Sequence, residues 1–241
     1  MTRAASNFAM TITSSHLLSQ ILDGPESRVY MEPFSFLIAE GVLPESARVA
    51  LANDFPRYPS AGFFPHEPAD CGPGINGLID QLTSPAFADA VGGLLGIDHL
   101  AQYPSLVTIC RLLNKRHGTI HTDSRSKIAT ALIYFNKSWS HGSEGCLRFL
   151  NRIDAIDDTV APEIKPVYGN FVMFRRADNS FHGHLPHEGE RRVIQIAWLT
   201  SADEMLRKTR RGKFSRLFKK LFGSLDRKLG ANRDRNASHP R

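Results

Sequence analysis

Residues 121–139 read HTDSRSKIATALIYFNKSW and combine a possible metal-binding pair with the start of a strand. His121 and Asp123 are two positions apart, so on an extended backbone their side chains point to the same face and can reach one ion. The segment Lys127–Asn136 is rich in β-branched and aromatic residues and runs into a turn sequence, which predicts a β-strand. The stretch therefore predicts two metal ligands just ahead of a strand.

Segments on either side of this stretch have the composition of further short strands. Helices are expected before them, one after Leu43 and one whose N-cap and first residue are Ser84 and Pro85. Residues 56–77 are dense in Pro and Gly, which predicts a long loop. Helices followed by many short strands predict a mainly β fold, an antiparallel sandwich or jelly roll with helices on one side. The further strands are expected at Ser105–Leu113, Gly145–Leu150, Phe171–Arg175 and Arg192–Thr200.

Length and composition indicate one globular domain with an appendage. The chain has 241 residues, of which 41% are hydrophobic. We expect a lead-in over residues 1–33, a domain over 34–200 with its strand-rich core at 105–200, and a basic tail over 201–241.

Cysteine usage and hydropathy indicate the compartment. The cysteines Cys71, Cys110 and Cys146 lie far apart without a C-x-x-C spacing, which argues against a disulfide framework and a cysteine-based zinc site. No stretch approaches the roughly 20 apolar residues of a membrane span. These features predict a cytoplasmic protein.

A third metal ligand is expected later in the strand-rich half. His182 follows Ser180-Phe181, and two imidazoles with one carboxylate make the facial triad that binds Fe(II) and leaves open coordination positions. His184 is the rival ligand, because residues two apart share a face of a strand. The ten-residue interval from His182 to Arg192 favours His182.

Arg192 is the expected anchor for an anionic co-substrate. The open positions on the metal suit a 2-oxo acid, and a guanidinium grips the far carboxylate of a dicarboxylate through two hydrogen bonds. Arg192 alternates with Ile194, Ile196 and Trp198 on one face of its strand, so Arg191 is expected at the surface. The hydroxyl of Tyr134 is a second candidate donor to the same carboxylate.

These motifs together resemble the catalytic domain of the prolyl 4-hydroxylase-like 2-oxoglutarate/Fe(II) dioxygenases. The resemblance covers about residues 105–200 and rests on an ordered set of motifs: His121-Thr-Asp123, Leu132–Trp139, Glu144–Arg148, Asn179–His182 and Arg192–Trp198. It implies a double-stranded β-helix, a jelly roll. It also implies hydroxylation of a substrate with O2 and 2-oxoglutarate, releasing succinate and CO2.

The resemblance implies a role for each candidate residue. Iron would be bound by His121, Asp123 and His182, and 2-oxoglutarate by Arg192 with assistance from Tyr134. Ascorbate would keep the iron reduced. His117, His141 and His187 are expected to be exposed loop histidines, and Arg148 either lines the pocket or, the favoured reading, pairs with a surface acid.

The substrate is left open by the sequence. Peptidyl proline is the default by resemblance, and a small molecule, peptide natural product, glycan or lipid is compatible. Residues 109–118 contain no tyrosine, although many members of the family place aromatic contacts there. A jelly roll that binds a metal or ligand without turnover is the alternative of a different class. A nucleic-acid demethylase is disfavoured, because no base-binding lid or added arginine pattern follows His182.

The tail concentrates the positive charge of the chain. Residues 205–241 hold 13 of the 30 Lys and Arg residues, against only Asp226 and Asp234. Apolar residues recur in it at helical spacing from Phe214 to Leu225, which predicts a basic amphipathic helix. Residues 205–229 could contact an anionic membrane surface, with the protein peripheral on it, or dock on the acidic body. Nucleic acid is the weakest option, since no nucleic-acid motif accompanies the helix.

Overall fold

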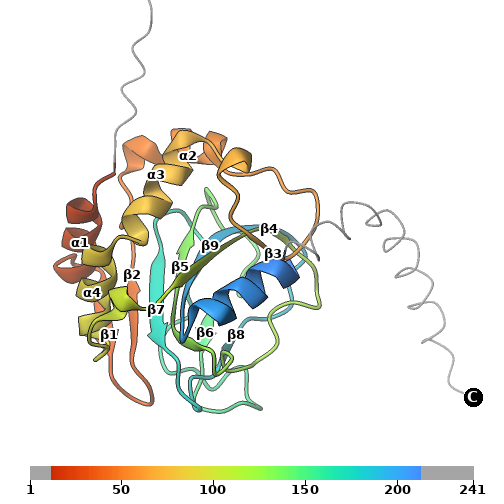
Figure 1. Cartoon of the computed structure of the whole chain (residues 1–241). Coiled ribbons are helices and arrows are strands. Elements are labelled where there is room, and N and C mark those ends of the chain that lie inside the picture. Colours follow the sequence, from red (N-terminus) through yellow and green to blue (C-terminus); the bar gives the residue numbers. More distant parts are fainter. Residues whose placement is uncertain (1–11, 213–241) are drawn as a thin grey trace, which may run out of the picture.

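The computed structural model describes residues 12–212, which form a large antiparallel sheet facing a short second sheet (Figure 1). The large sheet has the order β1 (Ser27–Tyr30), β2 (Phe36–Ala39), β7 (Phe171–Arg175), β5 (Lys127–Tyr134), β9 (Gly189–Leu199), β4 (Ser105–Leu113) and β3 (Phe63–Pro65). The short sheet pairs β6 (Arg148–Phe149) with β8 (His182–Gly183). Isolated bridges such as His121 to His182 extend it. The predicted double-stranded β-helix is confirmed.

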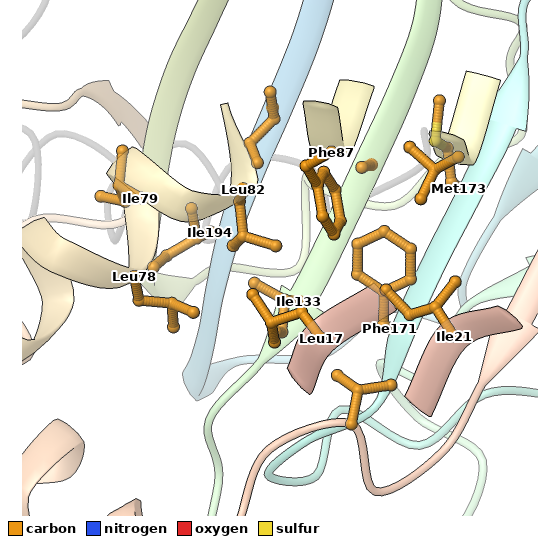
Figure 2. Close-up of a cluster of buried hydrophobic side chains, with 14 of the residues drawn as sticks. Leu17, Ile21, Leu78, Ile79, Leu82, Phe87, Ile133, Phe171, Met173 and Ile194 are labelled. Atoms are coloured by element: carbon orange, nitrogen blue, oxygen red, sulfur yellow. The ribbon is translucent and has the colours of Figure 1, made fainter. Parts of the chain in front are cut away.

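Helices cover one face of the large sheet. They are α1 (Ser14–Leu22), α2 (Arg48–Asp54), α3 (Pro73–Leu82) and α4 (Pro85–Leu94), with short 3-10 turns at Glu45–Ala47, Pro68–Asp70 and Leu100–Gln102. Figure 2 shows Leu17, Leu82 and Phe87 from three of these helices packed over Ile133 and Phe171 of the sheet. The predicted cap of α4 is confirmed, because the Ser84 hydroxyl accepts a hydrogen bond from the backbone N–H of Phe87.

The large sheet contributes to two hydrophobic cores. Along β5, Ala131 and Ile133 lie in the core under the helices, whereas Leu132 and Tyr134 lie in the core between the two sheets. Successive side chains of a strand point to opposite faces, so neighbouring residues of one strand serve different cores. The face of a strand therefore decides whether a polar side chain meets the helices or the space between the sheets.

The boundary predicted at residue 33 is wrong, because the segment before it belongs to the domain. Leu17 and Ile21 are buried in the helix-side core, and β1 pairs in register with β2 as the edge of the large sheet. The partner of β2 is β7, more than a hundred residues away in the chain, so no local pattern reveals this pairing.

The loop predicted over residues 56–77 is also wrong in part. It contains the short strand β3, which pairs with β4, and α3 begins within it at Pro73. Proline has no N–H to donate, which suits the first turn of a helix. A proline-rich segment can therefore also contain the start of a helix.

The C-terminal tail is described only in part. Residues 202–212 form a helix that leaves β9, and Gly212 at its end lies against Pro65. The predicted amphipathic segment from Phe214 to Leu225 lies outside the described residues. Within residues 12–212, no helix combines the length and apolarity that a membrane crossing requires.

Candidate metal centre

The three predicted metal ligands meet at the edge of the short sheet. His121 and His182 form a bridge in which each backbone N–H donates to the other's carbonyl at 3.0 Å. Asp123 follows two residues after His121. One ligand atom from each of the three side chains lies within 4.8 Å of the other two. The backbone bridge therefore brings together ligands that are far apart in sequence.

Hydrogen bonds orient both imidazoles for metal binding. Nδ1 of His121 lies 2.8 Å from the carbonyl oxygen of Thr119, and Nδ1 of His182 lies 2.9 Å from that of Ser180. A carbonyl only accepts, so each Nδ1 carries the proton and each Nε2 presents a lone pair. Fixing the tautomer in this way is typical of metal-binding histidines.

The third ligand, Asp123, is a buried carboxylate held by two donors. Lys127 Nζ lies 2.7 Å from Oδ1, and the Thr130 hydroxyl donates to Oδ2 at 2.5 Å. Burial alone would raise the pKa of Asp123, but the charge of Lys127, the nearby His182 ring and these hydrogen bonds lower it to about 2. The side chain is therefore an anion at neutral pH, which is the form that binds a cation.

His182 is buried between aromatic rings and is neutral. Its ring centroid lies 4.5 Å from that of Phe174, and burial lowers its pKa to about 4 despite the nearby charge of Asp123. His184 lies outside the three-residue group, with Nδ1 at 2.7 Å from the carbonyl oxygen of Leu185. The choice of His182 over His184 agrees with this geometry.

The donor set fits Fe(II). Two neutral imidazole nitrogens and one carboxylate oxygen are the ligands of a facial triad, and no cysteine belongs to the group. His121 is exposed whereas Asp123 and His182 are buried, so the centre lies at an opening of the β-helix. A small co-substrate and a larger substrate can both approach from that side.

Arg191, not Arg192, points into the space between the sheets. Arg191 is only 3% exposed, so its prediction as a surface charge is wrong. Its Nη2 donates to the Tyr134 hydroxyl at 3.2 Å, and its Nε donates to the carbonyl of Gly145 at 2.8 Å. Arg192 alternates with Arg191 and lies on the helix side, where its guanidinium carbon is 5.8 Å from the centre of the Phe55 ring. The alternation was predicted correctly, but the face was assigned wrongly.

Arg191 is a buried cation without an acidic partner. Among residues 12–212, no carboxylate oxygen lies within ion-pair distance of its guanidinium, although eight other arginines make such pairs. A buried charge is costly unless it is paired, so this position is suited to an anionic ligand. Tyr134 lies beside it, and burial raises the pKa of that phenol, which keeps its proton available for donation.

The comparisons with known proteins agree with this centre. Residues 107–200 match the sequence model of the 2OG-Fe(II) oxygenase superfamily. These residues therefore carry the sequence pattern of that superfamily. No curated protein sequence matches the chain.

Solved structures share the fold of the oxygenase. A prolyl-4-hydroxylase from Pseudomonas putida is 19% identical, with a TM-score of 0.51 over 76% of this chain and 92% of that one. A prolyl hydroxylase from Trichoplax adhaerens, solved with a hypoxia inducible factor peptide, is 14% identical, with a TM-score of 0.50 over 80% of this chain and 93% of that one. At these identities the likeness establishes the fold alone.

Two residues predicted near the surface are buried beside the oxygenase centre. Arg148 is 8% exposed, but it makes the expected pair with a surface acid, Asp157, at 2.6 Å and a second pair with Glu163 at 2.9 Å. His187 is 2% exposed and packs against the Trp139 ring at a centroid distance of 4.7 Å. His187 lies in the irregular segment between β8 and β9, where no periodicity separates buried from exposed positions.

The buried histidines predict an acid-labile fold for the metal-free oxygenase. Burial lowers the pKa values of His182 and His184 to about 4, below the ordinary 6.5. Between these values the unfolded chain binds more protons, so stability is fully present above pH 6.5 and is lost as the pH falls toward 4. We expect the free energy of unfolding to drop by at least about 2 kcal/mol between pH 7 and pH 5.

Urea denaturation of the metal-free protein at the two pH values measures this loss. The His184→Gln variant removes one of the two titrating groups and should lose less stability on acidification than the parent. Equal unfolding free energies at pH 7 and pH 5 in the parent would contradict the assignment of both rings as neutral and buried.

Proposed function

We propose that the protein is a 2-oxoglutarate-dependent Fe(II) dioxygenase that hydroxylates a substrate, releasing succinate and CO2. His121, Asp123 and His182 hold the iron, and Arg191 holds the far carboxylate of 2-oxoglutarate. The observation that supports this most directly is the buried Arg191 guanidinium, which has no acidic partner in the described residues and faces the same inter-sheet space as the metal ligands.

One face of β5 links the two ends of the co-substrate site. Thr130 holds the Asp123 carboxylate, and Tyr134, four residues along the same face, accepts from Arg191. A strand rises about 3.3 Å per residue, so the Cα atoms of Thr130 and Tyr134 are roughly 13 Å apart along the strand. Both side chains point inward. We infer that an extended dicarboxylate lies along this face, with its far end between Arg191 and Tyr134.

The protein side of the reaction is binding, orientation and exclusion of water. Iron with 2-oxoglutarate and O2 supplies the oxidising chemistry when bound. Arg191 pairs with one carboxylate and so fixes which end of the co-substrate reaches the metal. The Tyr134 hydroxyl donates a second hydrogen bond to that carboxylate while its oxygen accepts from Arg191. The apolar walls of Leu132, Phe174 and Val193 keep water from this space.

Peptidyl proline remains the default substrate in this proposal. The fold-level neighbours include prolyl hydroxylases from Pseudomonas putida and Trichoplax adhaerens, and a small molecule, glycan or lipid substrate is compatible with the same centre. Ascorbate is proposed as the reductant of the iron. Contact of residues 205–229 with an anionic membrane surface stays a prediction, because only residues 205–212 of that segment are described.

The proposal is tested by anaerobic titration with Fe(II) and 2-oxoglutarate, followed by O2 and ascorbate. Saturable binding of both and release of succinate, even uncoupled from substrate, is the expected result. Iron binding without 2-oxoglutarate binding would instead support a metal-binding jelly roll without turnover. Absence of iron binding would refute the metal centre itself.

A further inference from the structure

A cavity with charged side chains in its lining lies on the helix side of the large sheet, away from the metal centre. It has a volume of about 300 Å³ and lies where α2, the end of β5 and the start of β9 meet. Its lining includes three cations, Arg48, Lys137 and Arg192, and one carboxylate, Glu190. The formal charge of these side chains is therefore 3 − 1 = +2, although the domain outside the tail is mildly acidic.

Arg192 is held rigidly at this cavity. Its guanidinium donates from Nε to Glu190 and from Nη1 to the carbonyl of Ala52 at 3.4 Å, and it lies near the Phe55 ring. Its side chain is nevertheless 24% exposed. A guanidinium has five N–H donors, so several remain for a ligand after these contacts.

Arg48 and Lys137 add positive charge from two other segments of the chain, the start of α2 and the turn after β5. Arg48 donates from Nε to Glu45, and within residues 12–212 its terminal nitrogens make no hydrogen bond. No carboxylate of the described chain lies within ion-pair distance of Lys137. Glu190 is the one acid in the lining, and it is shared with Arg111 at 3.3 Å. The cations therefore outnumber their intramolecular partners.

Hydrogen bonds from the Asn136 side chain hold the backbone beneath the cavity in place. The Asn136 side chain accepts from the backbone N–H of Arg192 at 2.7 Å and donates to the carbonyl of Glu190 at 3.1 Å. Phe135 and Ala52 provide an apolar floor. A preorganised site binds an anion without first ordering its own side chains, which reduces the cost of binding.

We propose that this cavity binds a phosphate group. Three cations from three separate segments suit the several terminal oxygens of a tetrahedral phosphate, whereas a carboxylate is satisfied by one guanidinium fork. The volume leaves space beside the phosphate, so a small phosphate ester fits as well as the free ion. The site lies on the opposite face of β9 from Arg191, so its ligand is distinct from the co-substrate of the proposed oxygenase reaction.

Calorimetric titration of inorganic phosphate into the metal-free full chain, at constant ionic strength, tests the proposal. We expect saturable binding that is at least tenfold weaker in Arg192→Ala and in Arg48→Ala. The matched control is Arg175→Ala, an exposed arginine on β7 that does not line the cavity. It should bind phosphate like the parent. A parallel titration with glycerol phosphate identifies the kind of ligand. Tighter binding than inorganic phosphate indicates an organic ester, and equal binding indicates the free ion.

No saturable binding, or equal binding by all four proteins, would overturn the proposal. Equal binding would place the phosphate elsewhere, at Arg191 or on the basic tail, both of which every variant retains. The result does not depend on the metal centre, because the titration contains no metal or 2-oxoglutarate. A failed phosphate site and a failed oxygenase assignment are therefore separate outcomes.

Discussion

The His182→Ala variant is expected to lose Fe(II) binding and succinate release by more than about a hundredfold. Changes to residues that only support a ligand already cost 10- to 100-fold, and loss of a ligand itself costs more. Asp123→Ala should have an equal effect, and it also leaves the half-buried ammonium of Lys127 without its partner at 2.7 Å. Anaerobic equilibrium binding of Fe(II) and a succinate assay measure both losses.

His184→Ala is the matched control for this experiment. Both histidines are buried, lie two residues apart and have pKa values lowered to about 4, yet only His182 belongs to the three-residue group. The control should therefore keep iron binding within a few-fold of the parent. If His184→Ala loses iron and His182→Ala retains it, the third ligand has been assigned to the wrong residue. Circular dichroism on each variant separates loss of the metal from loss of the fold.

The Arg191→Ala variant is expected to raise the 2-oxoglutarate concentration for half-maximal succinate release by about a hundredfold. Hydrogen bonds to charged groups contribute roughly 1.5–3 kcal/mol each, and each 1.4 kcal/mol corresponds to a tenfold change in binding. Arg191→Lys keeps the charge but not the guanidinium fork, so an intermediate rise is expected. A succinate assay over a range of 2-oxoglutarate concentrations measures these changes.

Arg192→Ala distinguishes the role of Arg192 in 2-oxoglutarate binding from that of Arg191. Arg192 lies on the helix side of β9 and donates to Glu190 and Ala52, so its loss should change the 2-oxoglutarate requirement less than about threefold, which is less than 1 kcal/mol. A large rise in Arg192→Ala with a small one in Arg191→Ala would restore the anchor expected from the sequence. Iron binding should be retained in both variants, because neither arginine contacts a metal ligand.

The spacing of a few residues was sufficient to predict the metal centre. On an extended backbone, His121 and Asp123 share a face by geometry alone, and the composition of the flanking segments predicted β4 and β7 with their observed bounds. The N-cap at Ser84 was also predictable, because capping depends on local hydrogen bonds. Local rules therefore placed His121 and Asp123 on one face and determined many of the elements.

Pairing between distant segments was decided by the tertiary structure. The strands β1 and β2 are short, and they are stabilised by β7, whose residues lie far along the chain. The backbone bridge between His121 and His182 likewise closes the metal centre across two distant segments. Such contacts depend on which surfaces are buried together, which no local sequence pattern records.

The choice between Arg191 and Arg192 illustrates the same limit most clearly. The sequence by itself determined that the two side chains point to opposite faces of one strand, since side chains alternate along any strand. It did not determine which face is covered by helices and which faces the short sheet. Only the packing of both layers placed Arg191 beside Tyr134 and Arg192 beside α2, because each face is defined by the elements that bury it.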